Sequence, residues 1–232
     1  NSLGIGDLED LKLLIDWSSK CAYSIIQLLP MNEVGPTFCP YDSISSFALE
    51  PVYARLKPSA LGKIRSSQGS SNPRVDYNVK DEKMRLLKDL YNKKKLIASN
   101  KEFTLFVEEN RYWIDDYSLF KALKGYHNHA PWYEWPEGYK SRDKCLLGQF
   151  EKEHKEGISF YKWTQWVLFK QFKDAKRYAG SKKVLIKGDL PILVSRDSAD
   201  VWAHQDFFKL EFAAGAPPDM YCALGQRWGM PT

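Results

Sequence analysis

The sequence reads Lys187-Gly188-Asp189-Leu190-Pro191-Ile192-Leu193-Val194-Ser195-Arg196-Asp197-Ser198-Ala199-Asp200-Val201-Trp202 directly after an apolar run that starts at Val184. We expect a strand region over Val184–Val194, whose buried apolar start from Val184 to Ile186 runs into the lone carboxylate of Asp189. A carboxylate at the end of a buried strand is where an α/β barrel places functional groups. Asp189 is therefore a candidate site residue. The competing interpretation, an Asp that caps the next turn or pairs with a basic neighbour, remains open.

Composition places the chain among ordinary globular proteins. Its 232 residues suffice for one sizeable core or two small ones. Hydrophobic residues make up 44% and charged residues 27%, which is typical of such proteins. Aromatics reach 14%, which fits a large core or a surface that stacks on flat ligands such as sugar rings. Composition alone favours the core.

The net charge of +5 is a local excess. Lys93-Lys94-Lys95 lies in a Lys-rich helical pattern where Asp81, Glu82 and Asp89 alternate with the lysines, which favours a solvated helix face over a nucleic-acid partner. No apolar run is long enough to span a bilayer, so we expect no membrane partner.

The four cysteines lie far apart and include no C-x-x-C pair, so we expect reduced thiols, no zinc site and a cytoplasmic protein. His127 and His129 have no carboxylate at metal-ligand spacing. We therefore assign no metal and no cofactor.

The order of expected elements indicates an α/β protein with a parallel sheet. Asp7 opens a helix with Asp10 at the capping-box position. Strands are expected over Ser24–Leu29 and Ala48–Leu56, the second weakened by Pro51. Further helical patterns cover residues 81–99, 101–126, 151–179 and 201–208.

This order leaves room for about three strands of a (β/α)8 TIM-type barrel, because some ninety residues form an apparent helical insertion. We expect a partial barrel in three segments. Residues 1–58 hold the first strands and a long substrate loop. Residues 59–150 form the mainly helical insertion. Residues 151–232 hold a barrel helix, the third strand and a lid loop over the site.

Two loops carry aromatic and polar residues suited to sugars. The later one reads Pro217-Pro218-Asp219-Met220-Tyr221 and then Gly225-Gln226-Arg227-Trp228-Gly229. Exposed loops seldom carry such residues this densely without a use. Sugar faces stack on aromatic rings, and carboxylates and amides bind hydroxyls, so we favour a binding loop over an ordinary surface loop.

The earlier loop follows the first expected strand, and Pro40 can present Tyr41 at its rim. Spacing alone does not separate this from packing of Tyr41 beneath the loop. Asp115-Asp116-Tyr117 is better explained by a solvated helical face.

Together these motifs resemble glycoside hydrolase family 77, the 4-α-glucanotransferases. The motifs that carry the resemblance are Leu28-Leu29-Pro30, Pro40-Tyr41-Asp42, Ser46-Phe47-Ala48, Asp116 to Phe120, Trp163-Thr164-Gln165-Trp166, Gly188 to Trp202, and Pro217 to Gly229. The resemblance implies a TIM-type barrel with helical insertions. It also implies transfer of α-1,4-glucan segments between maltooligosaccharides with retention, through two carboxylates about 5 Å apart.

The resemblance also assigns roles by position. Asp189 matches a strand-end Asp in the donor subsite, and Tyr41 matches an aromatic at the rim of the site. Tyr117 matches a remote glucan contact. The lid loop is matched by Asp219, Tyr221, Gln226 and Trp228.

The resemblance places the catalytic groups outside this sequence. The family's nucleophile lies in an Arg-x-Asp-His motif, with the acid/base Glu later still. Arg196-Asp197-Ser198 is not that motif, so we expect the nucleophile and the acid/base beyond Thr232 and no catalytic residue within residues 1–232. We therefore expect this polypeptide to be inactive alone. Two alternatives are a non-catalytic α-glucan-binding module and an α-glucan hydrolase of the α-amylase group.

Overall fold

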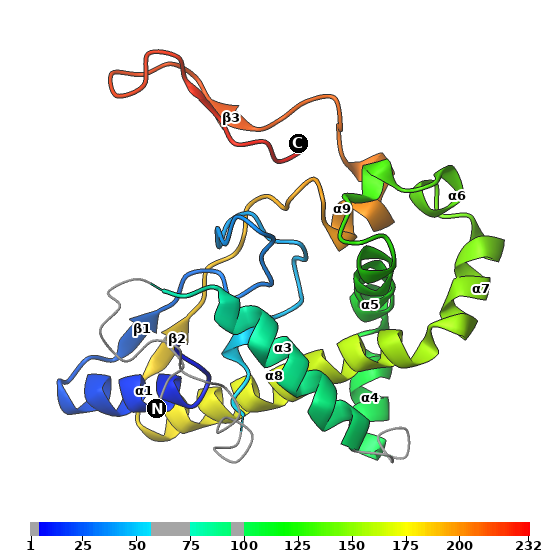
Figure 1. Cartoon of the computed structure of the whole chain (residues 1–232). Coiled ribbons are helices and arrows are strands. Elements are labelled where there is room, and N and C mark those ends of the chain that lie inside the picture. The colour runs from blue at the N-terminus through cyan, green and yellow to red at the C-terminus, as the bar shows by residue number, and fades with distance from the viewer. Residues whose placement is uncertain (1–4, 57–74, 94–99) are drawn as a thin grey trace. The chain divides into compact units, whose positions relative to one another are not determined.

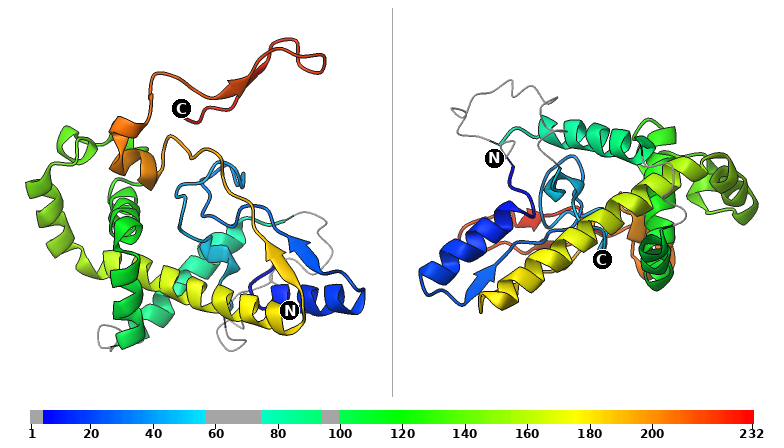
Figure 2. Two further views of the ribbon diagram at one scale, coloured as in Figure 1. Left: turned by 180° about the vertical axis from the view of Figure 1, so that it is seen from behind. Right: turned by 90° about the horizontal axis from the view of Figure 1, so that it is seen from below.

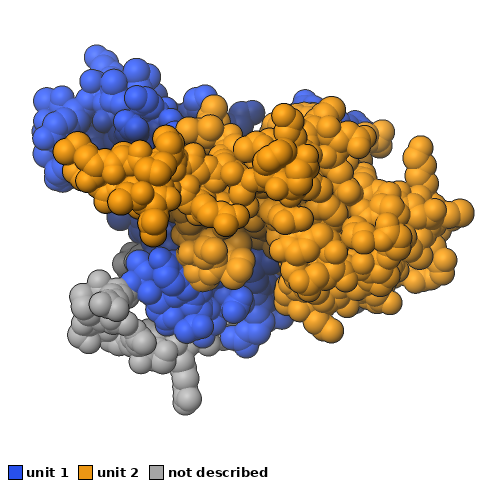
Figure 3. All heavy atoms as spheres, turned by 90° about the horizontal axis from the view of Figure 1, so that it is seen from above, with its two compact units in different colours: residues 1–29, 49–109, 163–189 blue, residues 30–48, 110–162, 190–232 orange. Residues whose placement is uncertain are grey.

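The computed structural model describes residues 5–56, 75–93 and 100–232, which form mixed helix and strand (Figure 1). They fall into two compact units assembled from interleaved segments (Figure 3). Unit 1 holds residues 1–29, 49–109 and 163–189, and unit 2 holds residues 30–48, 110–162 and 190–232. The sequence predicted three consecutive segments of a partial barrel, and that division stays a prediction. The two units describe instead which segments, distant along the chain, pack together.

Unit 1 combines helices with a short parallel strand pair. Its elements are α1 (Asp10–Lys20), β1 (Ile25–Gln27), the 3-10 helix η1 (Pro51–Tyr53), α3 (Asn78–Lys93), α4 (Lys101–Glu109), the C-terminal part of α8 (Lys155–Ser181) and β2 (Leu185–Lys187). The views in Figures 1 and 2 agree in placing α1 and the end of α8 beside the two strands.

The strands β1 and β2 pair in parallel, with Ile25 opposite Leu185 and Ile26 opposite Ile186. The N–H of Leu28 donates to the Lys187 carbonyl at 2.9 Å and extends the pair. Ile26 is buried, but Ile25 and Leu185 are 55% and 66% exposed. Of the strand predicted over Val184–Val194, only Leu185–Lys187 is confirmed.

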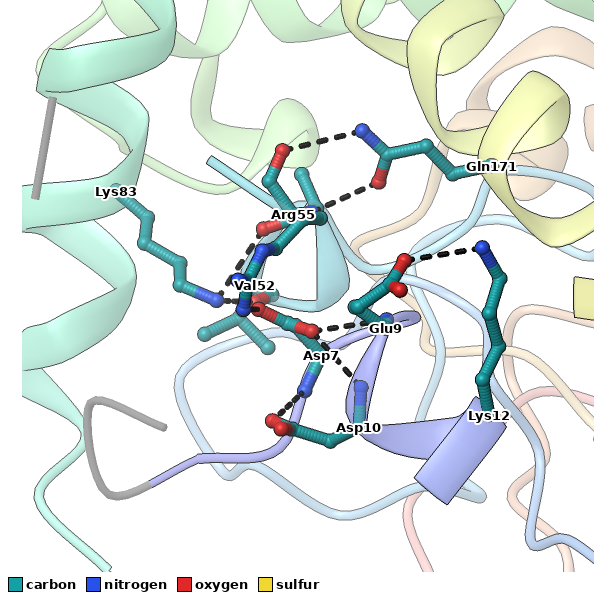
Figure 4. A network of polar contacts seen from close by, with 9 residues as sticks. Asp7, Glu9, Asp10, Lys12, Val52, Arg55, Lys83 and Gln171 are labelled. Carbon is teal, nitrogen blue, oxygen red and sulfur yellow. Dashed lines mark hydrogen bonds and ion pairs between the residues drawn. The ribbon is translucent and has the colours of Figure 1, made fainter. Parts of the chain in front are cut away.

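A reciprocal cap starts α1, as the Asp7 and Asp10 pattern predicted (Figure 4). Asp7 Oδ1 accepts from the N–H groups of Glu9 and Asp10, and Asp10 Oδ2 accepts from the Asp7 N–H at 3.0 Å. The other Asp7 oxygen lies 3.3 Å from an Arg55 guanidinium nitrogen. These bonds satisfy N–H groups that a helix start leaves without partners.

The prediction of a strand over Ala48–Leu56 is wrong. Pro51 stands at the start of η1, and the Glu50 carboxylate caps it by accepting from the Val52 N–H at 3.3 Å. The backbone on either side is paired by side chains of α8. Gln165 bonds both the N–H and the carbonyl of Leu49, and Gln171 does the same for Arg55, at 2.8 to 3.1 Å.

The buried ammonium of Lys83 completes this arrangement by donating to the carbonyls of Val52 and Ala54 (Figure 4). Burial lowers the pKa of Lys83 below its usual value, while the nearby carboxylates of Asp7 and Asp10 act in the opposite direction. Side chains thus supply hydrogen bonds that a neighbouring strand would otherwise provide.

Aromatic contacts join α3 and α4 to α8. The rings of Tyr91 and Trp163 lie 5.7 Å apart, those of Phe103 and Trp166 5.9 Å, and those of Phe106 and Phe169 5.3 Å. The aromatic side chains of α8 therefore form a packing surface for α3 and α4.

Unit 2 is mainly helical and ends in a hairpin. Its elements are α5 (Arg111–Tyr126), the 3-10 helix η3 (Trp132–Glu134), α6 (Glu137–Lys140), α7 (Lys144–Glu153), the first turns of α8, α9 (Ala199–Ala203), the 3-10 helix η4 (Gln205–Phe207), β3 (Gly215–Ala216) and β4 (Gln226–Arg227). Its core includes the rings of Phe120, Trp135 and Trp202, which lie 5.6 to 5.9 Å from one another.

Two predicted helices are each divided. The pattern over 101–126 breaks at Asn110, whose side chain accepts from the Trp113 indole N–H at 3.0 Å. The pattern over 151–179 breaks at His154, whose ring stacks on Phe150 at 4.1 Å. Local periodicity continues through both breaks, so it did not reveal them.

Candidate functional site

The loop predicted to form a lid is a hairpin in unit 2. Strands β3 and β4 are antiparallel, with Ala216 opposite Gln226. The Trp228 N–H donates to the Ala214 carbonyl at 2.9 Å, and the Ala214 N–H donates to the Met230 carbonyl at 2.8 Å. The backbone of residues 214–230, which we call the lid hairpin, is therefore held by bonds among its own residues.

Thr232 lies at the base of the lid hairpin. Its carbonyl accepts from the Lys209 N–H at 2.6 Å, which ties the segment after β4 to the segment before β3. The contacts of Thr232 are thus part of the hairpin's support. The expectation that the nucleophile and the acid/base follow Thr232 concerns residues outside this sequence, so it stays a prediction.

Asp219 shapes the tip of the lid hairpin. Its Oδ1 accepts from the N–H groups of Tyr221 and Cys222 at 2.8 and 2.7 Å, and its own N–H donates to the Cys222 carbonyl at 3.1 Å. Gly225 closes the tip with a φ of +70°, and a Cβ there would lie 2.6 Å from the Ala216 carbonyl oxygen. Only glycine fits that position without strain.

The aromatic side chains of the lid hairpin face solvent. Tyr221 is 89% exposed and Trp228 is 51% exposed. The Trp228 indole N–H donates to Gln226 Oε1 at 2.9 Å, which holds the indole beside an amide whose NH2 group can still donate. A fixed ring next to a polar amide is suited to a sugar, which presents an apolar face and hydroxyl edges.

Tyr41 occupies the corner of a tight turn in the same unit. The Asp42 N–H donates to the Cys39 carbonyl at 3.0 Å, so Pro40 and Tyr41 are the two central residues of a turn. The Tyr41 side chain is 40% exposed. Pro40 and Tyr41 thus share the corner of this turn, and part of the Tyr41 side chain stays accessible.

Neighbouring elements hold the loop that carries Tyr41. Asp200, on α9, accepts from the Ser46 N–H at 3.0 Å, and the Ala199 N–H donates to the Ile44 carbonyl at 2.9 Å. Burial raises the pKa of Asp200, and the bond from Ser46 partly offsets that rise.

Asp189 belongs to unit 1 and comes two residues after the end of β2. It thus follows the carboxyl end of the parallel pair, at the edge where parallel strands place functional groups. Its side chain is partly exposed.

Tyr117 lies in the core of unit 2. It is 1% exposed, and its hydroxyl donates to the carboxylate of the equally buried Glu33. The expectation of a glucan contact there does not fit this burial, because no face of the ring is accessible for stacking. The flanking Asp115 and Asp116 form ion pairs with Lys162 and Arg142.

Four candidates, Asp219, Tyr221, Gln226 and Trp228, are thus brought together on one hairpin. Tyr41 lies in the same unit on its own loop. Asp197, in the run that lacks the nucleophile motif, pairs with Lys124 and accepts from the Trp132 N–H at 3.1 Å, so its contacts are structural.

Sequence reasoning did not single out Glu33, whose side chain bonds both Tyr117 and Lys121. The available signal was a lone acidic residue between an apolar strand and a loop with two prolines, where a carboxylate needs a partner if it is buried.

Within the described part of the chain, no three His, Cys, Asp or Glu side chains are grouped to hold a metal ion. No helix among those residues combines the length and apolar character needed to cross a membrane. All four cysteines are free thiols.

Comparison with known proteins gives one consistent result. The sequence model of glycoside hydrolase family 77, described as 4-alpha-glucanotransferase, matches residues 1–232. A 4-alpha-glucanotransferase of Chlamydia caviae is 39% identical over 243 residues, which cover all of this chain and 46% of that protein. One of Thermus thermophilus is 38% identical over 217 residues, covering 88% of this chain and 43% of that protein.

Among solved structures, an amylomaltase from Streptococcus agalactiae in complex with acarbose superposes with a TM-score of 0.89 at 26% identity. The match covers all of this chain and 50% of that one. The chain therefore spans about half the length of the relatives that it matches.

Proposed function

The chain belongs to the 4-alpha-glucanotransferase family, glycoside hydrolase family 77, and we propose that it is part of an enzyme that transfers α-1,4-glucan segments between maltooligosaccharides. The observation that carries this proposal is the family match along all 232 residues. The lid hairpin supports it, because Tyr221 and Trp228 offer exposed rings beside polar groups.

We assign the recognition of glucan to the residues that the family resemblance indicated. Asp189 binds the sugar in the donor subsite, and Tyr41 stacks at the rim of the site. The lid hairpin covers the bound glucan with Tyr221 and Trp228, while Gln226 and the Asp219 carboxylate bind hydroxyl groups. Carboxylates and amides suit this role because they bond two hydroxyls at once.

The proposed reaction is a retaining double displacement. One carboxylate attacks the anomeric carbon, and a second protonates the leaving sugar and later deprotonates the acceptor hydroxyl. We assign neither carboxylate to residues 1–232 and propose that both come from chain beyond Thr232. A lid that excludes water favours a sugar hydroxyl over water as the acceptor.

We further propose that β1 and β2 belong to a (β/α)8 barrel of which this chain forms only part. Their parallel pairing is consistent with such a barrel. The exposed Ile25 and Leu185 also support the proposal, since apolar strand residues are normally covered. We place the protein in the cytoplasm, where its free thiols would remain reduced.

Incubation with maltotriose tests the proposal. The complete gene product should release glucose and form longer maltooligosaccharides without a net gain of reducing ends, and the 232-residue chain alone should release none. A net gain of reducing ends would identify a hydrolase instead. Turnover by the 232-residue chain would contradict the assignment of the reacting carboxylates, and binding without turnover in the complete product would identify a binding module.

Asp189→Asn in the complete gene product tests the donor assignment, with Asp174→Asn as the matched control. Asp174 is a partly exposed residue of α8 whose carboxylate pairs with Arg177 at 3.0 Å. The first substitution should reduce turnover of maltotriose, and the second should leave it unchanged.

A further inference from the structure

Glu33 forms a buried polar cluster with two residues of α5. Its carboxylate accepts from the Tyr117 hydroxyl on one oxygen and from the Lys121 ammonium at 2.7 Å on the other. Glu33 and Tyr117 are each 1% exposed, and the Lys121 ammonium also lies 5.7 Å from the centre of the Tyr161 ring. A charged group is retained in such a place only where its partners compensate for lost water.

The backbone of the same residue closes the base of the loop. The Glu33 N–H donates to the Ala48 carbonyl, and the Glu33 carbonyl accepts from the Ile44 N–H, both at 2.8 Å. Val34 and Ser43 add an antiparallel bridge. Glu33 therefore holds both sides of the loop through its backbone and joins them to α5 through its side chain.

Residues 35–42, beyond this base, form two successive turns. The Phe38 N–H donates to the Gly35 carbonyl at 3.2 Å, and the turn with Tyr41 at its corner follows. The Thr37 hydroxyl donates to the Asp42 carboxylate at 3.0 Å. The turn that carries Tyr41 is thus closed by bonds within residues 35–42, and it stands on the base that the Glu33 backbone closes.

We propose that Glu33 is a positioning residue for Tyr41. It anchors the base of loop 30–48 to α5, so that the Tyr41 ring meets the glucan in one prepared orientation. The inference rests on the proposed function in one respect, the contact between Tyr41 and glucan. A contact group that is already ordered costs less conformational entropy when the ligand binds, so loss of the anchor should weaken binding.

The sharpest variant is Glu33→Gln in the complete gene product. It keeps the volume of the side chain but removes the charge and turns an amide NH2 toward a donor, Lys121 or Tyr117. The matched control is Glu50→Gln. Glu50 is also buried and paired with a lysine, Lys80 at 2.9 Å, but it lies in unit 1 and caps η1.

Two measurements separate positioning from a purely structural role. Hydrogen exchange, followed by mass spectrometry on peptides from residues 35–44, reports the order of the loop. Steady-state transfer from maltotriose gives KM and kcat separately. Thermal unfolding of both variants shows whether they are destabilised to a similar extent.

Glu33→Gln should speed exchange in residues 35–44 and raise KM about tenfold, with kcat changed by less than about twofold. Glu50→Gln should leave both quantities at their wild-type values. Tyr117→Phe, which keeps the ion pair, should give a smaller change than Glu33→Gln in the same direction.

The inference would be overturned if Glu33→Gln lowered the unfolding temperature but left exchange of the loop and KM unchanged. It would also be overturned if Glu50→Gln produced the same changes. A wild-type protein without transfer activity would overturn the proposed function, and the exchange comparison would still decide whether Glu33 orders the loop.

Discussion

Residues 30–48 and the lid hairpin both present an aromatic side chain assigned to glucan, but different interactions hold them. The first loop is held by α5 through Glu33 and by α9 through Asp200. The lid hairpin is held by its own backbone and by the Asp219 carboxylate at its tip. The first loop therefore depends on tertiary packing, and the second on local conformation.

This difference has an energetic consequence. One anchor of the first loop, the Glu33 carboxylate, is a buried charge, and loss of its cation would leave that charge unpaired in the protein interior. The bonds of the lid hairpin lie near solvent, where water replaces a lost partner. Substitutions in the two regions should therefore differ in size and in how far their effects extend.

The largest effect is expected for Lys121→Met, which leaves the buried Glu33 carboxylate without its cation. The free energy of unfolding should fall by about 3–5 kcal/mol, measured by urea denaturation. The control is Lys12→Met, which removes a surface pair with Glu9 at 3.0 Å and should cost less than about 1 kcal/mol. Equal losses in the two variants would show that the ion pair of Glu33 and Lys121 stabilises the protein no more than a surface pair does.

A smaller, pH-dependent effect is expected for Asp200→Asn. Burial raises the pKa of Asp200 above its ordinary value of 3.8, so the folded state retains a proton that the unfolded state loses. This contribution to stability is complete below about pH 3.8 and disappears as the pH rises through the raised pKa of the folded state. An Asn side chain can still accept from Ser46 and does not ionise.

The unfolding temperature of Asp200→Asn should therefore rise relative to wild type between pH 4 and neutrality, as the wild-type carboxylate ionises. Differential scanning calorimetry at several pH values measures this. If the difference in unfolding temperature between Asp200→Asn and wild type were the same at every pH, the pKa of Asp200 would be the same in the folded and unfolded states. The prediction would then be wrong.

The smallest effect on global stability is expected in the lid hairpin. Gly225→Ala places a Cβ 2.6 Å from the Ala216 carbonyl oxygen at a φ of +70°, with a local strain of about 1–3 kcal/mol. Distortion of the hairpin should release part of this strain, so the free energy of global unfolding should fall by no more than about 1–3 kcal/mol, less than in Lys121→Met. The Trp228 indole N–H resonance, assigned with Trp228→Phe, reports the local change.

Gly229→Ala is the matched control for this substitution. Gly229 has a φ of +85°, but a Cβ there meets no atom within 4 Å. Its substitution should disturb the Trp228 indole resonance less than Gly225→Ala does. An equal disturbance would show that backbone strain, and not contact with Ala216, controls the hairpin.

Sequence patterns predicted the features that depend on near neighbours. The capping pair Asp7 and Asp10 and the cores of the two paired strands were each indicated by residues a few positions apart. The family resemblance was also carried by short ordered motifs, and the family model matches the chain from end to end. The clustering of Asp219 through Trp228 followed from their closeness along the chain.

Other features depended on partners distant in the sequence. Gln165 and Gln171 each reach a backbone segment 116 residues earlier, and this pairing turned an expected strand into a 3-10 helix with extended flanks. Tyr117 was expected at a glucan contact and lies in the core, because Glu33, 84 residues earlier, accepts its hydroxyl.

The sequence by itself thus determined the cap that starts α1, the family, and the closeness of the candidate residues on the lid hairpin. The tertiary structure alone decided which polar groups are buried, which segments pair and what anchors the loop of Tyr41. The physical reason is that caps and periodicity act over one or two turns of chain, whereas burying a charge or a backbone group requires a partner that folding brings from elsewhere.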